Sequence, residues 1–403
     1  MRGFFAMPGL VIAVGMAGTV WAAEARNWTN QAGQTVTAEF GGVEDGQVIL
    51  ILPNSQGRVP LSQLSAADQQ WVNDHLGESS PPAGAAKAST EGKGAEGYNG
   101  PPALKEWPTT VALDEKGDAT VLEENDETKS YRYESEHYEF VCDSRIGVAT
   151  VREFSKVFEA TWLANCLLPL DIEPTPERLR TKFMARIFTD KADYFKEGGI
   201  EGSAGVYMSG KKALMLPLQS LGVKMVGKRV SIDYGSEDYR TLIHEITHQM
   251  MNHWLGPLPT WYIEGAAEYV ELAQYDNGRF KFTQQDNRLE DHLKNYGGEF
   301  PLVPLEILMN LDGRTWTSAL TSGDASKNYA SALALTYFFY HIDGDGKGTH
   351  FFEYMRGIRE MDRPTQEKLD ELTQTHLMRE RDYATLEEEL RKALRKMGVK
   401  CVE

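Results

Sequence analysis

The chain has 403 residues, of which 41% are hydrophobic and 25% are charged, and its formal net charge is −17. These proportions are those of a globular protein, and the length predicts two or three domains. An acidic chain is poorly suited to nucleic acid, because phosphate binding needs clustered lysine and arginine. Only one stretch is long and apolar enough to enter a bilayer, which excludes a multi-span membrane protein.

That apolar stretch lies at the N-terminus and has the layout of a secretory signal peptide. Arg2 gives a short positive region, residues 4–20 are apolar and almost uncharged, and small residues follow as far as Ala25. We therefore predict a signal peptide at residues 1–25, with cleavage after Ala25 preferred over Ala22. The mature protein would be exported to the periplasm or the extracellular space, with no membrane span. An uncleaved membrane anchor is the alternative.

The cysteines are too few to indicate a disulfide scaffold, since the chain has only three. Cys142 and Cys166 can pair in an oxidising compartment, which would leave Cys401 free. Three unpaired and mostly buried thiols are equally compatible with the sequence, so both arrangements stay open.

The first folded unit is predicted at residues 26–76. Its expected elements are three short strands and one helix, at 35–40, 48–52, 58–61 and 66–76. Asp45 and Gly46 form a hairpin-turn signal between the first two strands. Ser65 is the expected cap of the helix, with Asp68 in a capping-box position. About 50 residues of short strands with one helix indicate a small β-barrel.

Five features of this unit carry a family resemblance: Trp28, the strand at 38–40, the turn at 44–46, the strand at 59–61 and the helix start at 64–65. Together they resemble the Sla-one homology domain, a small barrel similar to the Src-homology-three fold. That family binds short peptide segments, so the resemblance implies a peptide or envelope partner for the barrel. A plain spacer domain is the alternative.

A linker and a large second domain follow. Residues 77–102 are rich in Gly, Ala, Ser, Pro, Lys and Glu, which predicts a flexible linker. Residues 103–403 have strand patterns first and helix patterns afterwards, which indicates an α+β domain. Strands are expected at 131–142, 182–188 and 206–218, and helices at 148–168, 191–196, 238–254, 262–274, 304–311, 325–341, 349–359, 365–378 and 385–396.

The pattern His-Glu-x-x-His occurs at His244, Glu245 and His248. On a helix the two histidines lie one turn apart on the same face, so both rings can bind one metal ion. Two imidazoles plus a carboxylate suit zinc. Glu245 projects to the side of this face, where it can take the proton of an attacking water. The five-residue pattern alone is also compatible with an ordinary amphipathic helix.

A second helix follows the turn at 256–259 and carries two further acidic candidates. Two helices joined by a short turn can pack side by side, which would bring Glu264 to the histidine pair as a third ligand. The fourth position would stay open to water, as in catalytic zinc sites. Glu268 lies one turn later on the same face. It either accepts the second ring N–H of a ligand histidine or is an ordinary solvated charge.

The run HEITH followed by WYIEGAAEYVE resembles the gluzincin zinc metallopeptidases. The resemblance covers residues 130–360 and implies a mixed sheet followed by a helical subdomain. It implies one zinc ion with His244, His248 and Glu264 as ligands, and Glu245 as general base and acid. The gap of 15 residues between His248 and Glu264 is shorter than in the aminopeptidase branch, so the loop between the helices must be tighter.

Two further segments match the same family. Tyr329, followed by small and apolar residues, resembles a family tyrosine that donates a hydrogen bond to the oxyanion; a buried structural tyrosine is the alternative. Gly205, Val206 and Tyr207 lie in a strand upstream of the metal-binding pattern, and in the family an edge strand there pairs with the substrate backbone. Aminopeptidases carry a glutamate in that strand. The residues at 205–209 include none, which favours an endopeptidase.

The segment beginning Asp343-Gly344-Asp345 has the composition of a calcium loop. It fails as an EF-hand because Lys347 stands at the fifth position and Tyr354 at the twelfth, where a glutamate is needed. We interpret it as a polar turn between helices, with a weak cation site as the minority interpretation.

The sequence thus predicts a secreted zinc-dependent peptidase with one zinc ion and a peptide or protein substrate, and with no nucleic-acid partner. Two alternatives stay open. The second domain is a metallopeptidase-like binding protein without turnover, or it is a zinc hydrolase that acts on a non-peptide amide of the cell envelope.

Overall fold

The computed structural model divides the chain into two compact units, Met1–Lys93 and Gly94–Glu403, which are described separately. The predicted signal peptide at 1–25 and most of the predicted linker, 77–97, lie outside the described residues. Residues 98–102, which the linker prediction included, belong to the second unit. The described residues are 26–31, 35–44, 47–52, 55–60, 63–65, 67–69, 72, 98–114, 117–177, 180–200, 203, 205–226, 229–232, 239–296, 299–313, 315–316, 325–361 and 364–402.

The first unit contains an antiparallel sheet with the strand order β1-β2-β3-β4. The strands span Arg26–Thr29, Thr35–Glu44, Gln47–Leu52 and Ser55–Pro60. Glu44 is paired with Gln47, and the predicted turn at 45–46 lies outside the described residues. Trp28 is fully buried, and its indole N–H donates to the Ala38 carbonyl at 2.9 Å. The closed barrel stays a prediction.

Ser65 and Asp68 make the contact that the capping pattern predicts. The Asp68 N–H donates to Ser65 Oγ at 3.2 Å, and that hydroxyl donates to Asp68 Oδ2 at 2.9 Å. The same buried carboxylate accepts from the Arg26 guanidinium at 2.6 Å and from the Thr29 N–H at 2.7 Å. Asp68 therefore ties the helical turn after Ser65 to β1. The predicted helix at 66–76 is described only in part.

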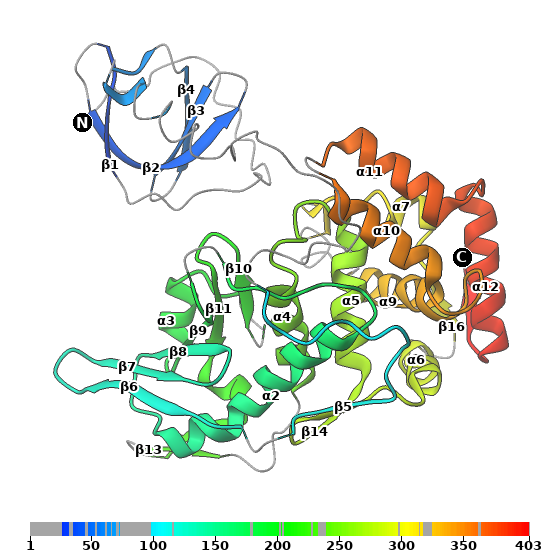
Figure 1. Cartoon of the computed structure of the whole chain (residues 1–403), viewed down its shortest axis with the longest axis horizontal. Coiled ribbons are helices and arrows are strands. Elements are labelled where there is room, and N and C mark those ends of the chain that lie inside the picture. Colours follow the sequence, from blue (N-terminus) through cyan, green and yellow to red (C-terminus); the bar gives the residue numbers. More distant parts are fainter. Residues whose placement is uncertain are drawn as a thin grey trace, which may run out of the picture. The chain divides into compact units, whose positions relative to one another are not determined.

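The second unit is built on a six-stranded mixed sheet with the order β10-β11-β9-β8-β7-β6 (Figure 1). Its strands, from β6 to β11, span Thr120–Asn125, Ser130–Glu134, Tyr138–Cys142, Phe183–Phe188, Val206–Met208 and Ala213–Pro217. The strands β8, β9 and β11 are parallel, and the outer strands are antiparallel to their neighbours. This arrangement confirms the α+β prediction.

Side-chain alternation along the strands decides which helix covers which face of the sheet. Leu214 and Leu216 of β11 belong to the main core, where α2 (Val148–Leu167) and α4 (Arg240–Met250) pack. Ala213 and Met215 point the other way, into a smaller cluster under α3 (Lys191–Lys196). The helix α4 contacts both β10 and β11, so it lies at the β10 end of the sheet (Figure 1).

Two predicted long strands are hairpins in the structure. The predicted strand at 131–142 is the pair β7 and β8, and the predicted strand at 206–218 is the pair β10 and β11. The second turn places Lys212 at a φ of 50°, a left-handed conformation that a lysine does not announce in sequence. Those two predictions were wrong because they passed over the polar turns at 135–137 and 209–212, the second of which contains the turn signal Ser209–Gly210.

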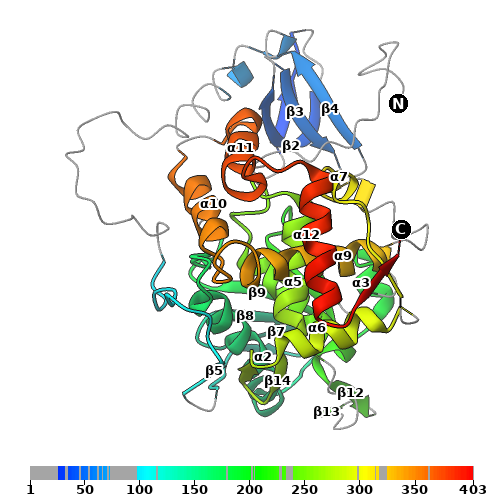
Figure 2. The same cartoon turned by 90° about the vertical axis from the view of Figure 1, so that its right-hand side faces the viewer.

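The helical part of the second unit begins after β11 (Figure 2). Its helices, α5 to α7 and α9 to α12, span Thr260–Leu272, Gln285–Lys294, Leu305–Leu308, Ala325–His341, Thr349–Glu360, Gln366–Leu372 and Tyr383–Lys396. A π-helical segment, η3 at Thr373–Met378, follows α11. The predicted helices at 191–196 and 325–341 have the observed bounds, whereas α6 has no counterpart among the predictions.

Three small sheets of short strands complete the described part of this unit. They were not predicted, since segments of three or four residues carry little periodicity. The sheets are β14 (Gln274–Asp276) with β15 (Arg279–Lys281) and β5 (Thr110–Ala112), β12 (Val223–Val226) with β13 (Arg229–Ile232), and β16 (Glu299–Pro301) with β17 (Lys400–Val402).

The cysteines and the helix lengths answer two further points from the sequence. Cys142, Cys166 and Cys401 are all free thiols, which is the second of the two arrangements left open. Among the described residues, every helix is too short or too polar to cross a bilayer.

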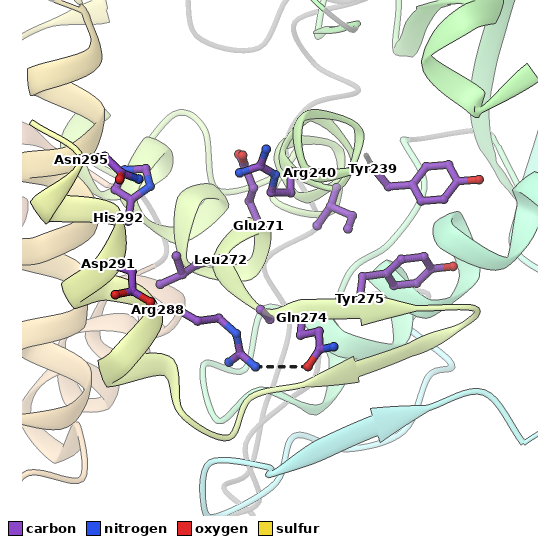
Figure 3. Close-up of a pocket in the computed structure, with 12 residues that line it drawn as sticks. Tyr239, Arg240, Glu271, Leu272, Gln274, Tyr275, Arg288, Asp291, His292 and Asn295 are labelled. Carbon is purple, nitrogen blue, oxygen red and sulfur yellow. Dashed lines mark hydrogen bonds between the residues drawn. The ribbon is translucent and has the colours of Figure 1, made fainter. Parts of the chain in front are cut away.

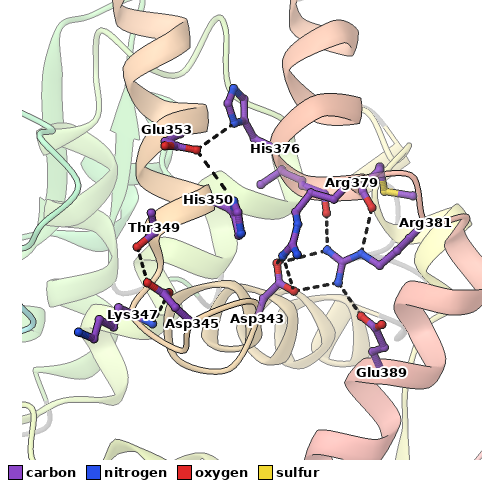
Figure 4. Close-up of polar contacts among 12 residues, drawn as sticks. Asp343, Asp345, Lys347, Thr349, His350, Glu353, His376, Arg379, Arg381 and Glu389 are labelled. Carbon is purple, nitrogen blue, oxygen red and sulfur yellow. Dashed lines mark hydrogen bonds and ion pairs between the residues drawn. The ribbon is translucent and has the colours of Figure 1, made fainter.

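The turn that resembles a calcium loop is occupied by the protein's own groups (Figure 4). Asp343 is buried and accepts from Arg381 at 2.8 Å and from Arg379 at 3.3 Å. Asp345 accepts from the Lys347 N–H at 2.9 Å and from the Thr349 hydroxyl at 2.7 Å. The segment is therefore a polar turn whose carboxylates fix α9, α10 and the end of η3 together.

Candidate metal centre

The predicted metal ligands lie on two helices that pack against each other, α4 and α5. The helix α4 buries Leu242, Ile243, Ile246 and Met250 in the main core, so its orientation is fixed by apolar packing. The predicted helix 238–254 is shorter in the structure, and residues 251–259 form the turn into α5. This short connection is what folds α5 back along α4.

Three ligand-type atoms converge between these helices. His244 Nε2 and His248 Nε2 are 3.0 Å apart, and Glu264 Oε2 lies 3.3 Å from each of them. Around a tetrahedral zinc with bonds of 2.0–2.1 Å, neighbouring ligand atoms are about 3.3 Å apart. The three atoms also carry lone pairs, so their approach is favourable only with a proton or a cation between them. The residues present therefore fit a zinc ion.

The close packing of α5 on α9 brings one more predicted group, Tyr329, to this point. A Cβ at Gly265 would lie 2.6 Å from the Ala332 carbonyl of α9, so only glycine permits this approach next to Glu264. Tyr329, on α9, has its ring 6.0 Å from the ring of His244. Burial raises the pKa of Tyr329 to about 12, so the phenol keeps its proton as a hydrogen-bond donor.

The charges at the site are strongly coupled. Burial opposes protonation of His244, but hydrogen bonds to Glu264 and Glu271 overcome it and raise its pKa well above the ordinary value. Burial also opposes ionisation of Glu264, yet His248 and His244 hold its pKa far below the usual range. Burial raises the pKa of Glu245, and the imidazoles only partly offset this. A buried glutamate with a raised pKa is well matched to proton transfer.

Behind His244, two carboxylates of α5 lie near the second ring nitrogen. His244 Nδ1 is 3.1 Å from Glu271 Oε2, whereas the nearest oxygen of Glu268 is 3.7 Å away. Burial and the charge of Glu271 raise the pKa of Glu268 to about 7. The role predicted for Glu268 stays a prediction, and Glu271 is the residue that sequence reasoning missed. Its position seven residues after Glu264, on the same face of α5, was the available signal.

Glu245 contacts the strand that we predicted to lie at an edge. The strand β10 ends the sheet order, and its Tyr207 N–H donates to Glu245 Oε2 at 3.2 Å. Gly205 and Val206 precede it in the same segment. The structure thus brings together all the predicted residues: the three ligands, Glu245, Tyr329, Glu268 and the 205–207 segment.

A cavity of about 400 Å³ opens beside this centre (Figure 3). Glu271 lines it, together with Arg240, Arg288 and His292, but none of the three predicted ligands does. The Arg288 guanidinium points across it to Gln274 at 3.5 Å. The cavity therefore lies on the Nδ1 side of His244, away from the point where the ligand atoms converge.

Comparison with known proteins identifies no close relative. No family model matches the chain, and no curated protein matches it. Among solved structures, a mutant of an M1 zinc metallopeptidase from Deinococcus radiodurans is similar with a TM-score of 0.33 and 14% sequence identity. The alignment covers 68% of this chain and 52% of that one, so the chain spans about half the length of that protein. A likeness this distant says nothing about the reaction or substrate of this chain.

Proposed function

We propose that the second unit is a zinc-dependent peptidase. The observation that carries this proposal is the convergence of His244 Nε2, His248 Nε2 and Glu264 Oε2 within 3.0–3.3 Å of one another. Three protein ligands leave a fourth position for water or substrate, which is the arrangement of catalytic rather than structural zinc. Glu245 stands beside this point with a raised pKa, and the Tyr329 ring lies 6.0 Å from the ring of His244.

The mechanism follows from what each side chain can do. A zinc ion bound here would act as a Lewis acid, polarising a carbonyl and lowering the pKa of a water to about 7. Glu245 takes the proton of the water that attacks the peptide carbonyl, and later gives a proton to the leaving amine. The Tyr329 hydroxyl donates a hydrogen bond to the oxygen that becomes negative. The edge strand β10 offers backbone groups to an extended substrate.

Finer features of the proposal rest on the sequence. Residues 205–207 contain no acidic side chain to bind a free amine, which supports an endopeptidase over an aminopeptidase. The segment at 1–25 supports export to the periplasm or the extracellular space. A peptide or envelope partner for the first unit rests on its resemblance to peptide-binding barrels.

Peptide-library profiling of the purified protein, with and without a chelator, tests the proposal. We expect cleavage inside peptides, including those with blocked N-termini, and loss of cleavage when the chelator removes zinc. If added zinc restores cleavage, the chelator acted by removing the metal ion and not by damaging the fold. A zinc-loaded protein that cleaves no member of a broad library would contradict a peptidase.

Two other functions remain as outcomes of that experiment. Zinc binding without any cleavage would favour a metallopeptidase-like binding protein. Cleavage of a cell-envelope amide, but of no peptide, would favour a zinc hydrolase of non-peptide amides. Both alternatives share the same ligand atoms, so only the substrate distinguishes them.

A further inference from the structure

The loop at 171–177 is an irregular segment that is tied to several parts of the second unit. It precedes β9 and contains Pro174 and Pro176, which restrict its backbone. Residues 172–175 provide three of its contacts. The Ile172 carbonyl accepts from the Trp254 indole at 2.9 Å, the Glu173 carboxylate accepts from Arg359 at 3.0 Å, and the Thr175 carbonyl accepts from the Asn252 amide at 3.0 Å. Two of these partners, Asn252 and Trp254, directly follow the metal-binding helix α4.

The last residue of this loop reaches the edge strand instead. Glu177 is only 6% exposed, and its Oε1 accepts from the Tyr207 hydroxyl at 2.7 Å. Its other oxygen is also buried, and among the residues that the structure describes it has no hydrogen-bond partner. Burying a carboxylate costs free energy unless contacts within the protein replace its lost hydration. The hydrogen bond between Glu177 and Tyr207 therefore needs an explanation.

Tyr207 joins this carboxylate to the proposed catalytic base. Its hydroxyl is bound by Glu177, and its backbone N–H donates to Glu245 Oε2 at 3.2 Å. The two contacts fix both the backbone and the hydroxyl of Tyr207. Its ring packs against the main core. The 171–177 loop is itself fixed to the end of α4, so α4, the loop and β10 form a closed circuit of contacts.

We propose that Glu177 is a positioning residue for Glu245, acting through Tyr207. By binding the phenol, Glu177 keeps β10 at the distance from α4 at which the Tyr207 N–H orients one oxygen of Glu245. The other oxygen of Glu245 is then left to face the attacking water. This inference rests on the proposed function, which supplies the reaction that Glu245 serves.

Three variants test it in the zinc-loaded full chain. Glu177→Ala removes the acceptor, Glu177→Gln keeps an amide oxygen that can accept from the phenol, and Tyr207→Phe removes only the hydroxyl. Tyr194→Phe is the matched control, because it removes a buried tyrosine hydroxyl that binds Ser203 at 2.8 Å under the opposite face of the same sheet.

The first readout does not depend on activity. Selective ¹⁵N-tyrosine labelling gives signals from 17 tyrosines, and Tyr207→Phe identifies the signal of interest as the one that disappears. We expect the Tyr207 amide to exchange with solvent at least about tenfold faster in Glu177→Ala, because the strand is released. In Glu177→Gln and Tyr194→Phe the rate should stay within about twofold of the parent.

The second readout is kinetic. Misplacing a catalytic group lowers turnover rather than binding, so kcat should fall about tenfold or more in Glu177→Ala and Tyr207→Phe while KM changes by less than about twofold. Zinc affinity, measured by chelator competition, should be unchanged, and Glu177→Gln should restore kcat. Unchanged exchange and kcat in Glu177→Ala, or failure of Glu177→Gln to restore either, overturns the proposal. If the parent cleaves no substrate, the proposed function fails, and the exchange rates alone decide whether Glu177 positions β10.

Discussion

The second unit contains two clusters of buried charge that are satisfied in opposite ways. Asp343 lies between two arginines, so its negative charge is neutralised by the protein itself (Figure 4). Glu264 faces two imidazoles at 3.3 Å, and within the described part of the chain no lysine or arginine forms an ion pair with it. The first cluster is closed by fixed cations, whereas the second becomes neutral only when a proton or a metal ion enters.

This difference separates structural from functional acid clusters. A closed cluster contributes to stability at all times, and breaking it exposes the unpaired partners to a low-polarity interior. An open cluster contributes little until its cation binds, and then it gains the free energy of metal binding. Variants at the two clusters should therefore differ in what they lose.

The largest effect is expected at Glu245. Glu245→Gln removes the proton acceptor without touching the three converging atoms, so turnover should fall by about 10²–10⁴-fold while zinc content stays at the parental level. Steady-state kinetics with a cleaved library peptide, together with metal analysis, check both parts. Parental turnover in this variant would rule out Glu245 as the base.

The next largest effect is expected at Asp343. Asp343→Ala leaves Arg379 and Arg381 without their buried partner, and the free energy of unfolding should fall by about 3 kcal/mol. Urea denaturation of the metal-free protein measures this. The comparison variant Glu264→Gln, in the same metal-free state, should lose clearly less. Equal losses would mean that the two clusters are satisfied alike.

A smaller effect is expected at Glu271, which accepts from the second nitrogen of His244. Glu271→Gln weakens that hydrogen bond, so zinc affinity should fall by about 10–100-fold. Chelator competition measures the change, and Glu268→Gln is the matched control on the same helix. If Glu268→Gln lowers the affinity more than Glu271→Gln does, the original prediction for Glu268 is the better one.

The smallest effect concerns a buried imidazole that binds a tyrosine hydroxyl. Burial lowers the pKa of His341 to about 4, and its Nε2 is 2.9 Å from the Tyr269 hydroxyl. The unfolded chain therefore binds a proton at this histidine between pH 6.5 and about 4 that the folded chain does not bind. The free energy of unfolding should therefore decrease as the pH is lowered through that window, by at most about 2 kcal/mol between pH 7 and 5. When the free energy of unfolding is measured by urea denaturation at several pH values, it should depend less steeply on pH in His341→Phe than in the parent. An unchanged pH dependence would assign the effect to other groups.

How far the sequence predicts the structure depends on whether a feature is local. The pair of histidines four residues apart and Glu264 after a short turn could be predicted because helix periodicity fixes their directions. Glu271 was missed because three glutamates share one face of α5, and only packing decides which one reaches His244 Nδ1. Glu177 was out of reach altogether, since its contact with Tyr207 spans 30 residues and three elements.

The fold shows the same limit. Helices such as α9 were predicted with their observed bounds, because their apolar patterns are long and end at clear signals. The hairpins β7–β8 and β10–β11 were each predicted as one strand, because the short polar turns inside them, including the Ser209–Gly210 pair of the second, were not recognised as breaks. The residues of β10 were therefore predicted to form a strand, but as part of one long strand and not as one arm of a hairpin.

The most direct test of the central claim is zinc stoichiometry. Equilibrium dialysis against buffered zinc, followed by elemental analysis, should give one ion per chain for the parent and none for the His244→Ala/His248→Ala double variant or for Glu264→Ala at the same free zinc. Parental binding by Glu264→Ala and the double variant, or no zinc in the parent, would contradict the convergence of these three side chains on a metal ion.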